Sequence, residues 1–228
     1  MIKYVTEFLG TLFLVLTIGL VVIGPGADAG AADQLILMVM VYGRHVSGAH
    51  YNPAVTLALA MRGKLPGERG GAHMVSQVLG AIVATVMVVM TGQTFAPVPG
   101  ASVTPVAALL VEVVFTFALA LVVLNVATHP ATRGNSYYGL AIGMTVGAAA
   151  FAGGPISGGA FNPAVGIGPT LVNALLQGGS FASLWYYLVG PRGRPWPPWC
   201  SSRRKTPPEP ADHRPAGPPR ARPFPSPR

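Results

Sequence analysis

The chain has 228 residues, of which 51% are hydrophobic and only 10% are charged. Because globular proteins carry about 25% charged residues, this composition excludes an ordinary water-soluble surface and favours a membrane protein. The net charge of +8 does not indicate nucleic-acid binding, because residues 191–228 hold nine basic and two acidic residues and the rest of the chain is near neutral. The single cysteine, Cys200, excludes an internal disulfide and a cysteine metal site, and no metal or cofactor is expected.

Several apolar runs approach the roughly 20 residues that cross a bilayer as an α-helix. The sequence therefore predicts an all-α membrane protein, since a transmembrane β-barrel would show alternating strands of about ten residues. The first run contains Glu7 and lacks a small-residue cleavage site, so it is interpreted as a retained span and not as a signal peptide. Gly- and Pro-rich connections separate the expected spans, which are Tyr4–Ile23, Ala31–Val46, Gly71–Met90, Val103–Ala127, Tyr137–Ala152 and an incomplete sixth that starts near Phe181.

Basic residues are distributed unevenly among the connections. Lys3 precedes the first span, and lysine or arginine occupies the connections after the second and fourth spans, whereas the connections after the first, third and fifth contain neither. The positive-inside rule then places the N-terminus in the cytoplasm, with the chain crossing the plasma or inner membrane several times.

The two halves of the chain resemble each other. The stretch "SGAHYNPAVTLAL" begins at Ser47, and "SGGAFNPAVGIGP" begins at Ser157, 110 residues later, with six identities in the first nine positions. Glu7 in "EFLGTLFLVL" is matched by Glu112 in "EVVFTFALALVVL". Three spans per half is an odd number, so the second half should enter the membrane inverted, with the shared site near the midplane.

Each half carries an Asn-Pro-Ala motif followed by an apolar stretch too short to cross the membrane. Asn is favoured as an N-cap and Pro at the first helical position, so the sequence predicts re-entrant half-helices over Ala54–Met61 and Ala164–Leu176. One such motif is usually only a cap or a kink, but two at equivalent places favour a pore. The half-helix N-termini, each with roughly half a positive charge, would oppose cations, while the Asn amides donate to water. The motif residues are Asn52, Pro53, Ala54, Asn162, Pro163 and Ala164.

These features resemble the major intrinsic protein family, the aquaporins and aquaglyceroporins, over about residues 1–190. The resemblance includes "EFLGT", both Asn-Pro-Ala stretches, "SQVLGA" and "LWYYLVGP". It implies a passive channel for water and small neutral solutes in the lipid bilayer, assembled as a homotetramer with one pore per protomer, without enzyme activity or nucleic-acid binding. It also implies that Glu7 and Glu112 support the re-entrant loops, and that pore-lining backbone is supplied by Ala49, His50, Gly158 and Ala160.

The first departure from the family pattern is Val165. Most members carry Arg directly after the second motif, where it lines the selectivity constriction. The neighbouring constriction positions fall on Gly159 and Ala150, and the fourth, near Ala32, stays open. Some plant vacuolar members also have Val there and are associated with water plus ammonia or urea. The sequence thus predicts a wide, apolar constriction that passes water, ammonia, urea or hydrogen peroxide; alternatively, Val165 only packs and another residue closes the pore.

The second departure is the end of the chain. An aquaporin-like channel domain is expected over residues 1–190, with repeats at about 1–95 and 101–190. Residues 191–228 contain thirteen of the 23 prolines, and a proline inside a helix costs about 3 kcal/mol, so the sixth span cannot continue there. This atypical tail is interpreted either as a disordered, lipid-binding segment or, by hypothesis, as the product of a reading-frame change near Pro191.

Three rival functions follow from these features. One is a broader facilitator of ammonia, urea or glycerol, although the Arg-Asp pair of glycerol-type members is absent. Another is a non-conducting remnant caused by the incomplete sixth span. The third is a coupled secondary transporter, which would need ionisable or polar ion sites at the midplane, where only Glu7 and Glu112 qualify.

Overall fold

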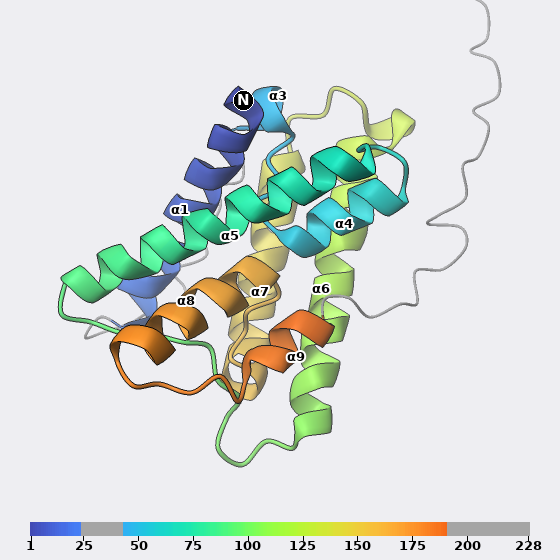
Figure 1. The fold of residues 1–228 in the computed structure, drawn as a ribbon. Helices are drawn as coiled ribbons and strands as arrows, with labels where there is room; N and C mark the ends of the chain where they lie inside the picture. Colours follow the sequence, from blue (N-terminus) through green and yellow to red (C-terminus); the bar gives the residue numbers. More distant parts are fainter. Residues whose placement is uncertain (24–42, 191–228) are drawn as a thin grey trace, which may run out of the picture.

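The computed structural model describes residues 1–23 and 43–190, and the secondary structure of this part of the chain is helical (Figure 1). Most of the predicted second span, the position near Ala32 and all of residues 191–228 lie outside the described residues. The elements in chain order are α1 (Ile2–Ile23), α3 (Arg44–Ser47), α4 (Pro53–Met61), α5 (Gly67–Met90), α6 (Pro105–Thr128), the 3-10 turn η1 (Pro130–Thr132), α7 (Tyr138–Ser157), α8 (Pro163–Leu176) and α9 (Leu184–Val189).

Four of the described helices are long and apolar enough to cross a membrane, namely α1, α5, α6 and α7. They correspond to the predicted first, third, fourth and fifth spans, with most ends shifted by a few residues. The predicted end of the fifth span at Ala152 is wrong, because α7 continues to Ser157 and Gly158 terminates it with a left-handed φ of 89°. Pro155 lies in the last turn of α7, so the one backbone hydrogen bond that its missing N–H removes is near the end of the helix.

Two helices start inside the apolar body of the protein. With a rise of about 1.5 Å per residue, α4 is roughly 13 Å long and α8 roughly 20 Å, so neither crosses a hydrocarbon core of about 30 Å. These are the predicted half-helices, and each begins at the Pro of its Asn-Pro-Ala motif. The predicted sixth span is represented by α9, whose six residues end at Val189.

Glycines allow α5 to lie directly against the helices on both of its sides. A Cβ at Gly80 would stand 2.3 Å from the carbonyl oxygen of Phe8 in α1, and a Cβ at Gly168 in α8 would stand 2.7 Å from Ala81. Small residues at helix crossings give close van der Waals contact in membranes, where the hydrophobic effect does not drive helices together. As a result α5 packs against both α1 and α8; in Figure 1 it lies across α1, and α8 runs beside it.

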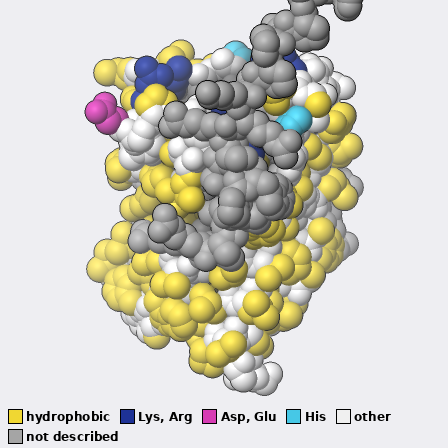
Figure 2. Space-filling view, turned by 90° about the vertical axis from the view of Figure 1, so that its right-hand side faces the viewer, with side chains coloured by type: hydrophobic (Ala, Val, Ile, Leu, Met, Phe, Trp, Pro, Cys, Tyr) yellow, Lys and Arg dark blue, Asp and Glu magenta, His cyan; other side chains and the backbone are white. Residues whose placement is uncertain are grey.

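The outer surface of the helices is apolar. Figure 2 shows hydrophobic side chains over much of one face, with the basic and acidic side chains gathered toward its upper end. This distribution fits helices that face lipid along their length and water at an end. The exposed side chains of the four long helices include Phe13, Val75, Leu79, Val114, Leu140 and Met144.

Gly80→Ala should destabilise the protein, although alanine in a helix is normally favoured over glycine by about 1 kcal/mol. The added Cβ would meet backbone of α1 that cannot rotate away, and such overpacking costs about 1–3 kcal/mol. We expect a lower melting temperature in detergent. The matched control is Gly71→Ala on the same helix, where nothing lies within 4 Å of the new Cβ; equal melting temperatures for the two variants would contradict the prediction.

Candidate functional site

The two half-helices begin with the same cap. Asn52 and Asn162 are the N-caps of α4 and α8, both with extended backbone, and their side-chain oxygens accept from Ala54 N at 2.8 Å and Ala164 N at 2.9 Å. Because the oxygen of each amide is turned toward its own helix, the nitrogen must face the opposite loop. Local capping chemistry therefore fixes the orientation of both amides.

The amides cross from one half of the protein to the other. Asn52 Nδ2 donates to the carbonyl of Phe161 at 3.0 Å, and Asn162 Nδ2 donates to the carbonyl of Tyr51 at 2.9 Å. These bonds join residues more than 100 positions apart. Each amide has two N–H donors, so one donor on each side chain is left for a molecule between the half-helices.

A buried carboxylate holds the loop that precedes α4. Glu7 in α1 is fully buried, and its Oε1 accepts from Ser47 Oγ at 2.6 Å and His50 N at 3.0 Å. Its Oε2 accepts from Tyr51 N at 2.8 Å and from Gln77 Nε2 at 2.7 Å. Four charge-assisted bonds satisfy this carboxylate at a depth where an unpaired charge would be costly.

The second half repeats three of these four bonds. Glu112 in α6 is also fully buried; Oε1 accepts from Ser157 Oγ at 2.7 Å and Ala160 N at 3.1 Å, and Oε2 accepts from Phe161 N at 2.8 Å. The predicted support of the re-entrant loops by the two glutamates thus has a definite geometry. Each carboxylate holds the two backbone N–H groups directly before its Asn.

The loops held by the glutamates have unusual backbone. Tyr51 and Phe161 adopt left-handed φ values of 50° and 46°, and Ala49 adopts 53°. A left-handed conformation costs a non-glycine residue roughly 1–2 kcal/mol, so it persists only where surrounding bonds hold it. The carboxylate bonds to Tyr51 N and Phe161 N supply that restraint, and the carbonyls of the same two residues accept from the Asn amides.

A cavity of about 450 Å³ runs beside the paired motifs. Both Asn side chains line it, as do the three predicted constriction residues Val165, Gly159 and Ala150. The wall is mostly apolar, and Val165 contributes a hydrocarbon surface where a charged side chain would bring donors. Further lining residues belong to α1, to the loop at 95–98 and to the re-entrant loops, among them Leu14, Phe95, His50, Gly158 and Ala160.

Some residues of the site had no predicted role. Tyr187 in α9 donates its hydroxyl to the carbonyl of Ser157 at 2.7 Å, and Gln77 donates to Glu7. The 110-residue offset between the two motifs also relates Gln77 to Tyr187 and Gly80 to Gly190. Extending the repeat comparison beyond the motifs would have identified both side chains as supports of the re-entrant loops.

Comparison with known proteins shows which family this chain resembles. Residues 1–192 match the family model of the major intrinsic proteins. The chain belongs to the major intrinsic protein family. Channels of this family are not enzymes, and this multi-pass member is a passive membrane channel for water and small neutral solutes.

The channel is similar to several plant aquaporins. It is 38% identical to aquaporin NIP1-1 of Zea mays over 201 residues, which cover 83% of this chain and 69% of the relative. It is 36% identical to aquaporin TIP4-4 of Zea mays over 174 residues, which cover 75% and 67% of the two chains. Among solved structures, the aquaglyceroporin from Plasmodium falciparum has the same fold, with a TM-score of 0.72 at 22% identity, covering 83% of this chain and 89% of that one.

Glu112→Gln should weaken the second re-entrant loop. A Gln side chain has a single acceptor oxygen, so at least one of the donors from Ser157, Ala160 and Phe161 loses its partner, and an unsatisfied buried donor costs about 1–3 kcal/mol. We expect a lower melting temperature in detergent than for the wild type. Glu68→Gln removes the same charge from an exposed site in the first turn of α5, where the charge is worth only about 0.3–1 kcal/mol, and should lower the melting temperature much less. Equal losses in both variants would argue against the support role.

Proposed function

We propose that water and small neutral solutes cross the membrane through the cavity beside the N-termini of α4 and α8. The observation that carries this proposal is the crossed pair of Asn amides, which leaves two fixed N–H donors in the wall of that cavity. A water oxygen that accepts from these donors has its hydrogens turned outward, which interrupts a chain of hydrogen bonds through the pore. The N-termini of the two half-helices, each with roughly half a positive charge, oppose cations at the same place.

The selectivity of the pore should be broad among neutral solutes. Val165, Gly159 and Ala150 supply neither charge nor side-chain donors, and two of them are small. We propose that these residues form the constriction and that ammonia, urea or hydrogen peroxide pass with water. The fourth constriction position lies outside the described residues.

Several further features are part of the proposal. The basic connections favour a cytoplasmic N-terminus in the plasma or inner membrane. Family likeness favours a homotetramer with one pore per protomer, and a channel domain over residues 1–190 built of two inverted repeats. The Pro- and Arg-rich residues 191–228 lie outside the described residues; an intact reading frame across codons 188–195 would refute the proposed frameshift.

A non-conducting remnant is the second candidate function. It is favoured by the thirteen prolines of residues 191–228 and by the family match, which ends at residue 192. Stopped-flow light scattering on proteoliposomes that contain the purified full chain distinguishes the two candidates. We expect water, urea and ammonia to cross the membrane faster than in empty liposomes. A water permeability equal to that of empty liposomes would support the remnant. A urea permeability equal to that of empty liposomes would refute the broad constriction.

Val165→Arg should convert the broad constriction into a strict one. The guanidinium brings bulk, charge and donors to the cavity wall, so we expect the ratio of urea to water permeability to fall roughly tenfold, equivalent to about 1.4 kcal/mol of barrier. Val165→Met adds length without charge and serves as the matched variant. A urea-to-water ratio that stays at the wild-type value in both variants would show that another residue sets the selectivity.

A further inference from the structure

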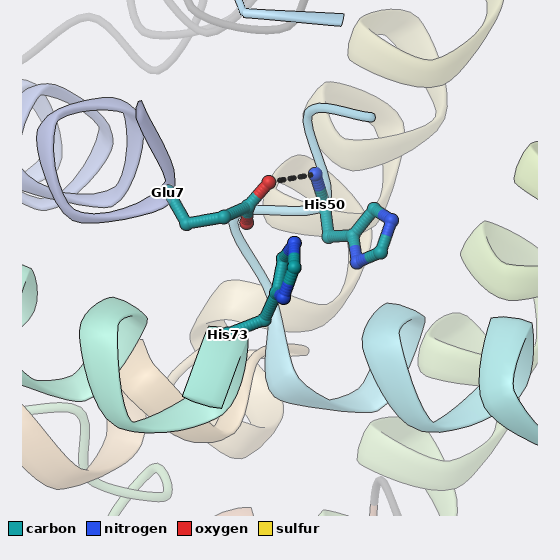
Figure 3. A group of neighbouring side chains, drawn as sticks. All are labelled: Glu7, His50 and His73. Carbon is teal, nitrogen blue, oxygen red and sulfur yellow. Dashed lines mark hydrogen bonds between the residues drawn. The ribbon is translucent and has the colours of Figure 1, made fainter. Parts of the chain in front are cut away.

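Three side chains near the start of α1 form a cluster that the loop-supporting role does not account for. Glu7 comes from α1, His50 from the first re-entrant loop and His73 from α5. Figure 3 shows the His73 ring turned toward the carboxylate, and the dashed line joins the carboxylate to the backbone N of His50, whose ring stacks beside that of His73. One possible ligand atom from each residue lies within 4.8 Å of the other two. Glu7 is 0% exposed, His50 6% and His73 1%. We propose that these residues form a binding site for a divalent transition-metal ion of the Zn²⁺ class.

His73 has the hydrogen bonding of a metal ligand. Its Nδ1 lies 2.7 Å from the carbonyl oxygen of Arg69, which can only accept, so Nδ1 carries the proton. The lone pair is therefore on Nε2, which is buried and has no hydrogen-bond partner in the described structure. Histidines that bind metals typically donate their other N–H to a backbone carbonyl in this way, which fixes the tautomer and the ring orientation.

His50 can supply a second nitrogen at low cost. Its ring stacks on that of His73 with centroids 5.2 Å apart, and its Nδ1 lies 3.1 Å from the hydroxyl of Thr56. Thr56 donates its single hydroxyl proton to the carbonyl of Asn52 at 3.1 Å, so the hydroxyl accepts from Nδ1 and the lone pair of this imidazole lies on Nε2.

Glu7 can supply the carboxylate oxygen because one of its four donors has another partner. Gln77 Nε2 donates to Glu7 Oε2 but also lies 3.0 Å from Thr56 Oγ1. If a metal takes the lone pair used by Gln77, that amide retains its bond to Thr56. The bonds from the backbone of His50 and Tyr51 need not change, so the loop stays supported.

The second half of the protein indicates that loop support does not need the histidines. Glu112 holds its loop through the equivalent bonds, but the 110-residue offset relates His50 to Ala160 and His73 to Ser183. The imidazoles therefore serve something other than the loop geometry. Two neutral nitrogens and one carboxylate are a ligand set that Zn²⁺ accepts, leaving one position for water.

Occupation of the site should reduce permeation, an effect that rests on the proposed function. Tetrahedral Zn²⁺ with bonds of about 2.1 Å places its ligand atoms roughly 3.4 Å apart, so binding draws the three side chains together. His50 lines the cavity, and metal binding would fix its ring in the cavity wall. We expect zinc to lower water permeability reversibly.

Zinc titration of the purified full chain tests the site without relying on transport. By isothermal titration calorimetry after treatment with a chelator, the wild type should bind one more Zn²⁺ per protomer than His73→Phe. Phenylalanine keeps an aromatic ring against Tyr4 and His50, which contact His73 in the wild type. His73→Cys replaces one zinc-binding side chain by another and should restore the binding of this ion. The controls His45→Phe and His129→Phe change exposed histidines outside the cluster and should bind as the wild type does.

Stopped-flow measurements with Zn²⁺ on both sides of proteoliposomes test the effect on transport, each variant being compared with its own zinc-free rate. Zinc should slow the wild type and His73→Cys, and a chelator should reverse this, whereas His73→Phe should not respond. Equal zinc stoichiometry in the wild type and His73→Phe would overturn the site. A chain that binds the ion but conducts no water would overturn the proposed function and leave the site intact; binding without any change in flux would overturn only the regulatory effect.

Discussion

Two buried carboxylates determine whether the pore can exist. Glu7 and Glu112 are placed in apolar helices, where a charge is tolerated only with full hydrogen bonding, and each obtains it from a re-entrant loop. The benefit is mutual, because the loop N–H groups would otherwise lack acceptors at a depth without water. Once Tyr51 and Phe161 are held in left-handed conformations, the following Asn and Pro residues start their helices in the interior of the protein.

The two halves achieve the same loop geometry with different outer supports. In the first half, Gln77 of the long helix α5 donates directly to the carboxylate; in the second, Tyr187 of the short helix α9 donates to a loop carbonyl. The supporting helix therefore does not carry the same side chain in the two halves. The glutamates and the crossed Asn amides are thus the common element, and the surrounding helices have diverged around them.

The features that the sequence predicted well have local causes. An Asn-Pro pair before a short apolar run starts a helix for reasons contained in those residues, and a glutamate in an apolar run requires buried partners wherever it lies. The predicted end of the fifth span was wrong because Gly153, Gly154 and Pro155 have the composition of a connection but lie near the end of α7. His73 was not singled out, because a lone histidine on an apolar helix reveals nothing until folding places it against residues from two distant segments.

The crossed bonds between Asn52 and Phe161 and between Asn162 and Tyr51 also limit how the channel can move. Displacement of either half-helix would break both bonds and disturb two loops that the glutamates hold on the other side. The centre of the pore therefore behaves as one rigid body made from both halves of the chain. A conformational change of the cavity that spares these two bonds must therefore take place away from the Asn pair.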